Sequence, residues 1–129
     1  MPGGGRWRGG RRCAGRAVRM LEPALLLLLD HGPAHGYTLL ERLDEFGLGG
    51  LDPSVTYRAL RDMEDAEWVT SAWDEEETQG PPRRVYHLTA LGNEALSTWV
   101  TSLQGTREAI DHLLGAYRRH MEEGRGEHH

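Results

Sequence analysis

The segment from Leu51 to Leu91 constrains the fold more than any other part of the chain. It combines a capped helix, a short alternating strand, a turn with two prolines and two arginines, and a returning strand. Asp52 is placed to cap a helix that begins at Pro53, where the missing N–H of proline costs nothing. Strand-like alternation then runs over Trp68–Trp73 and returns over Val85–Leu88. A helix followed by a basic β-hairpin predicts a winged helix-turn-helix, a mainly α fold with a small β-hairpin.

Two further helices are predicted upstream of this segment. Residues 20–30 are apolar almost all round, which is typical of a buried helix. A turn over 31–36 follows, because it contains Gly-Pro, and helical spacing then resumes over 37–46. The helix from Pro53 should run to about Ala66 and bury one stripe of side chains. That stripe is expected to consist of Val55, Ala59, Leu60 and Met63.

Apolar residues at helical spacing continue from Thr89 to about Met121, and Gly105 is expected to kink or split this helix. Such a helix has more apolar surface than a small domain covers, so we expect a partner chain, most simply through two-fold symmetry. The predicted organisation is a disordered Arg/Gly-rich arm (1–19), a winged helix-turn-helix domain (20–89), a C-terminal dimerisation helix (90–121) and a polar tail (122–129).

The net charge of −5 hides a strong asymmetry. Residues 1–20 carry six arginines and no acid, whereas residues 21–129 carry nine arginines and 20 acids. Nonspecific nucleic-acid binding depends on neutralising phosphates, so an acidic body argues against it. Any DNA-binding function therefore depends on local basic surface. The arm either adds phosphate or minor-groove contacts or is a tail without a role.

Local basic surface is expected first on the third helix. In a helix-turn-helix, this helix enters the major groove with its N-terminal residues foremost. Hydroxyl groups there suit phosphate oxygens, and two arginines one turn apart reach phosphates or guanine edges. The alternative is an ordinary surface helix, with Arg58 paired to Asp62. The candidate DNA-binding residues are Ser54, Thr56, Tyr57, Arg58 and Arg61.

The hairpin supplies the second basic surface. Pro81 and Pro82 stiffen its tip, and Arg83 and Arg84 emerge where a wing would meet the phosphate backbone. The acidic run 75–77 is a complication, because it either repels DNA or satisfies the arginines across the hairpin. We expect this run to face away from DNA or to engage the Arg-rich arm.

Three segments, LLLLLDHGPAHGYTLLERL, DPSVTYRALRDMED and GPPRRVYHLTALGNEAL, resemble the PadR-type winged-helix transcriptional regulators over about residues 20–120. The most specific pieces are His35-Gly36-Tyr37, Tyr57-Arg58-Ala59-Leu60 and Leu88-Thr89-x-x-Gly92. The resemblance implies a homodimer, binding to palindromic operators in double-stranded DNA and, usually, repression relieved by a small molecule. It also implies DNA contacts by Tyr37, Thr56, Tyr57, Arg83 and Arg84. The family commonly has Gly, then Thr or Ser, ahead of Leu-Tyr, whereas this chain has Ser54-Val55-Thr56-Tyr57, so individual base contacts are not carried over.

Some members of this family bind flat apolar compounds between the C-terminal helices of the dimer. By that likeness, a small apolar effector would lie at Trp99, with Val100 and Leu103 beside it. The alternative is that Trp99 packs as part of the dimer core, since aromatic residues often dominate interfaces.

Other chemistry finds little support in the sequence. No histidine or cysteine spacing matches a metal site and no catalytic motif has a credible context, so we expect no cofactor, no metal and no enzyme activity. Cys13, the single cysteine, excludes an internal disulfide and is either a redox switch or an inert residue. The lack of a membrane span or export signal predicts a cytoplasmic location.

The sequence as a whole predicts a ligand-responsive, homodimeric repressor that binds specific DNA. Two alternatives stay open. One is a winged-helix module that binds proteins, since fold does not determine function. The other is a metal- or redox-responsive regulator that uses the N-terminal arm.

Overall fold

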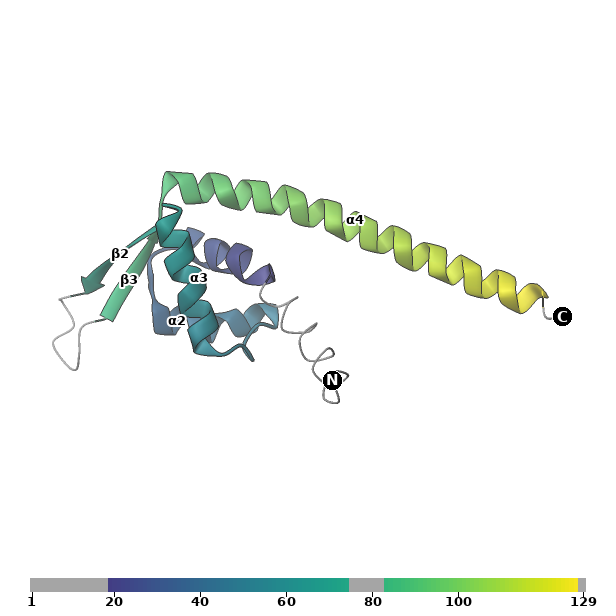
Figure 1. Cartoon of the computed structure of the whole chain (residues 1–129), viewed down its shortest axis with the longest axis horizontal. Coiled ribbons are helices and arrows are strands. Elements are labelled where there is room, and N and C mark those ends of the chain that lie inside the picture. The colour runs from purple at the N-terminus through teal and green to yellow at the C-terminus, as the bar shows by residue number, and fades with distance from the viewer. Residues whose placement is uncertain (1–18, 75–82, 128–129) are drawn as a thin grey trace, which may run out of the picture. The chain divides into compact units, whose positions relative to one another are not determined.

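The computed structural model describes residues 19–74 and 83–127 of the 129-residue chain (Figure 1). The chain divides into two compact units, with the boundary between Leu96 and Ser97. The elements are a first helix over 19–30, then β1 (Ala34–His35), α2 (Gly36–Arg42), the 3-10 helix η1 (Leu43–Phe46), α3 (Pro53–Asp65), β2 (Val69–Asp74), β3 (Arg83–Leu88) and α4 (Ala90–Glu127).

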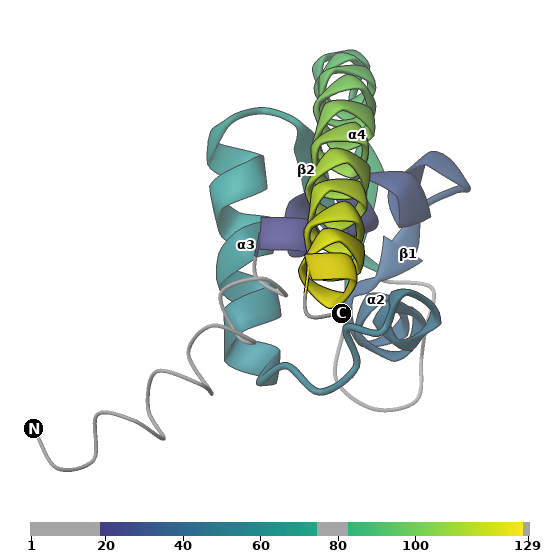
Figure 2. The same ribbon diagram turned by 90° about the vertical axis from the view of Figure 1, so that its right-hand side faces the viewer.

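The first helix is the centre of the first unit. Leu25 and Leu26 have no exposed surface, and Leu21, Leu28 and Leu29 are also buried. Figure 2 shows this helix between α3 on one side and β1 with α2 on the other. The prediction of a buried helix is confirmed. Burial of each leucine contributes about 1.5–3 kcal/mol relative to an exposed one.

The helix α3 packs on this core by one stripe of its surface. Thr56, Leu60 and Met63 are buried, at the spacing that places three side chains on one helical face. The expected stripe was therefore correct at Leu60 and Met63. Val55 and Ala59 are only half-buried, because they lie beside the stripe and not on it.

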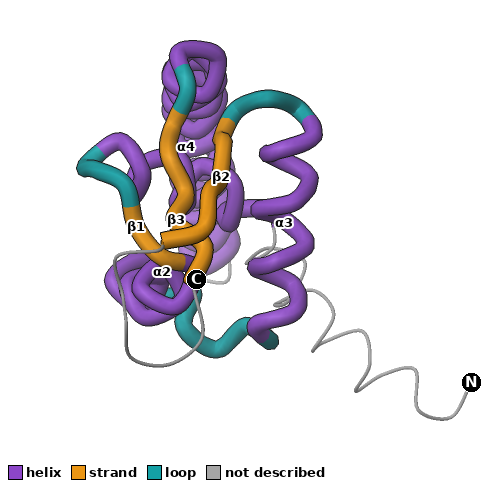
Figure 3. The backbone as a smooth tube through the Cα atoms, turned by 90° about the vertical axis from the view of Figure 1, so that its left-hand side faces the viewer, coloured by secondary structure: helices purple, strands orange, loops and turns teal. Residues whose placement is uncertain are grey.

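The sheet has three antiparallel strands in the order β1-β3-β2, and Figure 3 shows β1 beside the longer hairpin. The hairpin of β2 and β3, called the wing below, agrees with the predicted strands. β1 was not predicted, because its two residues lie in the stretch assigned to a turn. A contact of 3.0 Å between His35 Nε2 and Asp74 Oδ2 joins β1 to β2 across β3. This side-chain contact adds to the backbone pairing that holds the short strand on the wing.

A Schellman turn ends α3 and leads into β2. The N–H of Trp68 donates to the carbonyl of Met63 at 2.9 Å, and the N–H of Glu67 donates to the carbonyl of Glu64 at 3.0 Å. Glu67 has a φ of 65°, the left-handed conformation that this motif requires. The turn sets where β2 begins relative to α3.

The Thr89-x-x-Gly92 motif attaches the start of α4 to this turn. The Thr89 hydroxyl lies 2.7 Å from the carbonyl oxygen of Glu67 and accepts a hydrogen bond from the N–H of Gly92 at 2.9 Å. It therefore caps α4 while it contacts the α3–β2 turn. Gly92 is buried, and a Cβ there would lie 2.1 Å from the carbonyl oxygen of Trp68. The close approach explains why the motif ends in glycine.

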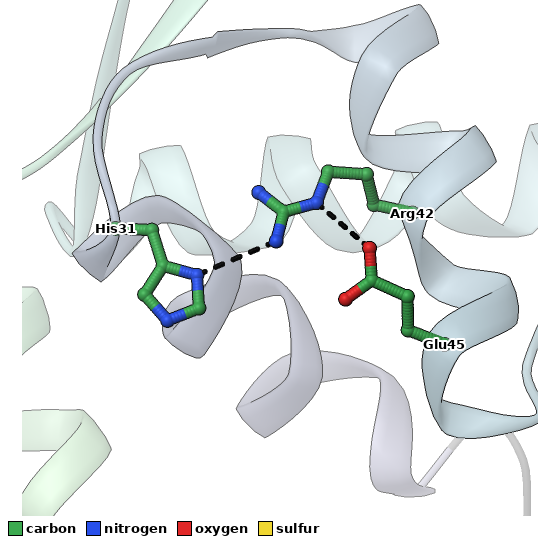
Figure 4. A network of polar contacts seen from close by, with 3 residues as sticks. All are labelled: His31, Arg42 and Glu45. Carbon is green, nitrogen blue, oxygen red and sulfur yellow. Dashed lines mark hydrogen bonds and ion pairs between the residues drawn. The ribbon is translucent and has the colours of Figure 1, made fainter.

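A smaller polar network joins the turn after the first helix to α2 and η1 (Figure 4). Arg42 Nε donates to Glu45 Oε2 at 3.0 Å, and Arg42 Nη2 lies 3.5 Å from His31 Nδ1. The hydrogen bond from Arg42 lowers the pKa of the Glu45 carboxyl. Because the pair is exposed, its contribution to the stability of the fold is small.

The helix α4 is a single element of 38 residues. Gly105 does not split it, and it continues through most of the expected polar tail to Glu127. No helix in residues 19–74 or 83–127 is both long and apolar enough to cross a membrane. Beyond Leu96, α4 leaves a series of large apolar side chains exposed: Val100, Ile110, Leu113, Leu114, Tyr117 and Met121.

The junction at Gly92 yields a prediction about stability. Gly92→Ala should lower the free energy of unfolding by roughly 1–3 kcal/mol, because the new methyl group meets backbone atoms that cannot rotate away. Urea denaturation of the full chain measures this decrease. Gly50→Ala is the matched control, since a Cβ at Gly50 meets no atom within 4 Å. Equal stability of the two variants would contradict the assigned packing.

Candidate nucleic-acid interface

The N-terminal half of α3 presents polar side chains to solvent. The Asp52 carboxylate accepts a hydrogen bond from the N–H of Ser54 at 2.9 Å, which confirms the predicted cap. This hydrogen bond lowers the pKa of Asp52. Ser54, Tyr57, Arg58 and Arg61 are exposed, so four of the five candidates on this helix lie on the surface.

Thr56 is the exception among the candidates on α3. Its side chain is fully buried, and its hydroxyl has no hydrogen-bond partner among the described residues. It occupies the inward stripe with Leu60 and Met63, so its hydroxyl cannot reach a phosphate while α3 stays packed. The expectation of a direct DNA contact by Thr56 is therefore corrected, because the inward face of the helix holds it in the core.

Arg58 and Arg61 line a groove of about 580 Å³ between α3 and β3. Neither arginine forms an ion pair within the described part of the chain, so the alternative pairing of Arg58 with Asp62 is not seen there. Acidic side chains share the groove, which offsets much of its positive charge. The groove is lined by Tyr57, Arg58, Arg61, Asp62, Glu64, Asp65, Arg84 and Tyr86.

A second groove, of about 360 Å³, lies between the wing and the starts of α2 and α3, and we call it the wing groove. Among the described residues, its lining contains two arginines and no acid. Tyr37 is 60% exposed at its edge, and buried Tyr86 has a raised pKa because it is desolvated. The groove thus combines positive charge with aromatic surface. It is lined by His35, Gly36, Tyr37, Tyr57, Arg83, Arg84 and Tyr86.

The geometry of the wing groove explains the His35-Gly36-Tyr37 motif. A Cβ at Gly36 would lie 2.7 Å from Cε1 of Tyr57. Glycine therefore lets the Tyr57 ring rest against the first residue of α2. Two of the three motifs that carry the sequence resemblance, His35-Gly36-Tyr37 and Tyr57-Arg58-Ala59-Leu60, meet at this contact.

The two wing arginines have different surroundings. Arg83 is exposed, whereas Arg84 is half-buried. Arg84 Nη1 donates to the Ser71 hydroxyl at 2.7 Å, and that hydroxyl donates to Glu64 Oε2 at 2.7 Å. The Arg84 guanidinium also lies 4.6 Å from the ring centroid of Trp73. Ser71, Glu64 and Trp73 were not singled out from the sequence.

Several predicted features lie elsewhere or outside the described residues. The wing tip with its prolines and the acidic run 75–77 lie outside the described residues. So does the N-terminal arm with Cys13, except for its last residue, Arg19, which belongs to the first helix. Trp99 and Leu103 are half-buried and Val100 is exposed, all three in the second unit. In the part of the chain that the structure describes, no three histidine, cysteine or acidic side chains cluster as metal ligands.

A third helix with exposed arginines, followed by a wing that carries two more, defines a winged-helix fold of the DNA-binding type. The family described as the transcriptional regulator PadR-like family matches residues 25–98. This match covers more than half of the chain, and the chain belongs to that family. No curated protein matches the chain.

Solved structures agree with this assignment. A PadR-like transcription factor from Bacteroides fragilis is 28% identical, with a TM-score of 0.65 over 80% of this chain and 98% of that one. A conserved protein of unknown function, described as a potential transcriptional factor, is 34% identical, with a TM-score of 0.67 over 79% of this chain and 90% of that one. A PadR family regulator from Clostridium difficile, 21% identical over 74% of this chain and 98% of its own, shares the fold with a TM-score of 0.65.

The contact between Gly36 and Tyr57 can be tested by a double-mutant cycle. Gly36→Ala should destabilise the protein by about 1 kcal/mol, because the Tyr57 ring must move to admit the methyl group. The same substitution in a Tyr57→Ala background should cost less, since the ring is gone. Thermal unfolding of the four proteins measures the coupling. Purely additive effects would show that the ring does not rest on Gly36.

Proposed function

We propose that the protein is a homodimeric repressor that binds a palindromic operator and is released by a small apolar effector. The observation that carries this proposal is the pairing of an exposed, arginine-bearing face on α3 with a wing groove that holds two arginines and no acid among the described residues. Family membership supports the DNA-binding part. Such a regulator would work in the cytoplasm, where its DNA is.

In this proposal α3 enters the major groove with its N-terminal residues foremost. Arg58 and Arg61 are three residues apart, so both side chains can reach one groove floor. An arginine that binds a guanine edge in bidentate fashion contributes about 1–3 kcal/mol of discrimination against other bases. Acids lie beside these arginines in the groove and lower the affinity for DNA in general. Only a DNA sequence whose bases bind the guanidinium groups offsets this loss, so the acids favour selective binding.

The wing groove would hold the DNA backbone. A phosphate seated there can accept hydrogen bonds from the exposed Arg83 guanidinium and from the hydroxyls of Tyr37 and Tyr57. Such contacts place α3 in register on the duplex, while base edges in the major groove supply the specificity. Ser54, exposed at the start of α3, is a further candidate phosphate contact.

The exposed apolar series on α4 supports the dimer. Large side chains such as Leu113, 71% exposed, and Tyr117, 61% exposed, recur along the helix at helical spacing. A second copy of α4 would cover them by two-fold symmetry, the commonest arrangement of soluble homo-oligomers. Two copies of α3 would then read half-sites about 34–36 Å apart, one turn of DNA.

The effector would act on this dimer by shifting populations. A flat apolar molecule at Trp99, Val100 and Leu103 would favour a helix spacing that no longer fits the operator. A titration of Trp99 fluorescence with apolar ligands tests this part separately from DNA binding. If no such ligand changes the fluorescence, the proposal is restricted to a regulator without this pocket.

The acids along the outer face of α3 favour one other function, a module that binds proteins. Asp62, Glu64 and Asp65 line the same groove as the arginines, and such mixed charge also suits a protein surface. The DNA-binding proposal differs in one measurable respect, because counterion release makes DNA affinity strongly dependent on salt.

A mobility-shift titration tests DNA binding directly. The full chain should give a discrete shift on DNA from upstream of its own gene, and the shift should survive competitor DNA. Arg83→Ala should reduce the slope of log affinity against log salt by about 0.9 for each phosphate that the arginine neutralises. Arg107→Ala, which removes an exposed arginine from α4, is the control for charge alone. A slope that Arg83→Ala leaves unchanged would remove this residue from the interface.

The dimer can be tested without DNA. Leu113→Asp combined with Tyr117→Asp should yield a monomer in sedimentation equilibrium, because two carboxylates would be buried at the interface. Far-UV circular dichroism should stay close to that of the wild type, since both side chains are exposed in the single chain. Asp111→Asn is the control on the same helix. A double variant that sediments as a dimer would place the interface elsewhere.

A further inference from the structure

Arg84 is the wing residue whose role the proposed function does not settle. As a basic residue on a wing it could contact phosphate in the same way as Arg83. Its surroundings differ, because it is half-buried and already engaged by two residues of the protein. The contacts of Arg84 extend from the wing to the C-terminal half of α3.

The hydrogen bonds from Arg84 form a directed chain. Arg84 donates to the Ser71 hydroxyl, and that hydroxyl uses its single hydrogen to donate to the Glu64 carboxylate, both at 2.7 Å. A hydroxyl placed between a cation and an anion makes two charge-assisted hydrogen bonds, which are stronger than neutral ones. The chain joins β3 through β2 to α3.

Trp73 holds the guanidinium from a second direction. It lies directly opposite Arg84 in the β2–β3 ladder, and the guanidinium carbon is 4.6 Å from its ring centroid. That distance is within the range of an attractive cation–π interaction. The ring and the Ser71 hydroxyl together restrict the Arg84 side chain to one orientation.

We propose that Arg84 is a positioning residue: through Ser71 and Glu64 it holds the wing at a fixed place relative to α3, and it makes no phosphate contact of its own. The inference rests on the proposed function, since the benefit of a fixed wing is that α3 and Arg83 reach DNA together. Preorganising the wing in this way lowers the entropy that binding must otherwise remove.

Salt dependence separates this role from a phosphate contact. In an Arg83→Ala background, the further change Arg84→Ala should weaken binding to the operator on the order of tenfold while leaving the salt slope unchanged. If Arg84 contacted phosphate, the slope would fall by about 0.9 more. Such a fall would overturn the proposal.

Lysine at position 84 gives a second distinction. Lysine keeps the positive charge but lacks the planar fork that stacks and hydrogen-bonds at once. Arg84→Lys should therefore bind as weakly as Arg84→Ala. Recovery of wild-type affinity by lysine would mean that charge alone matters, which would overturn the positioning role.

A measurement without DNA distinguishes a failure of this inference from a failure of the proposed function. Hydrogen exchange of the amides in 69–74 and 83–88 should quicken in Arg84→Ala and in Ser71→Ala, and remain unchanged in Arg83→Ala. Thr70→Ala is the matched control, since it removes the exposed hydroxyl of the residue next to Ser71. Unchanged exchange in Arg84→Ala would overturn the proposal. Quickened exchange in a protein that binds no DNA would support the positioning of the wing and contradict only the DNA function.

Discussion

The rest of the first unit depends on the burial of the first helix. α3 and the sheet each have one apolar side only, represented by Leu60 and Val69, and both residues are fully buried. Neither element is long enough to be stable alone, since most helical stability in proteins comes from packing. The leucines of the first helix supply the apolar surface on which both can pack. The packing of every other element of this unit therefore depends on a first helix that carries leucine on nearly all sides.

This burial also decides which face of α3 can meet DNA. Once Thr56, Leu60 and Met63 point inward, the residues on the opposite face of α3 must point outward. Arg58 and Arg61 are exposed for this reason. The candidate DNA-binding face of α3 therefore lies opposite the buried stripe, and no residue can belong to both.

Signals between near neighbours in the chain were sufficient to predict the cap at Asp52 and the two strands of the wing, and both were confirmed. Thr56 was misplaced because hydrophobicity favours Val55 as the buried residue, whereas packing on the first helix decides which face of α3 turns inward. β1 becomes a strand only because its two residues pair with β3, far along the chain. The hydrogen bonds of Arg84 likewise require the β2–β3 register and the placement of α3. The two wing arginines therefore looked equivalent in sequence, and only their neighbours across the sheet distinguish them.

The Thr89-x-x-Gly92 junction leads from the first unit along α4 into the second. The Thr89 hydroxyl caps α4 and contacts the turn after α3, so the first residues of α4 are held by the same turn that sets the start of β2. Glycine at position 92, which lets the start of α4 lie against the Trp68 carbonyl, keeps this connection short.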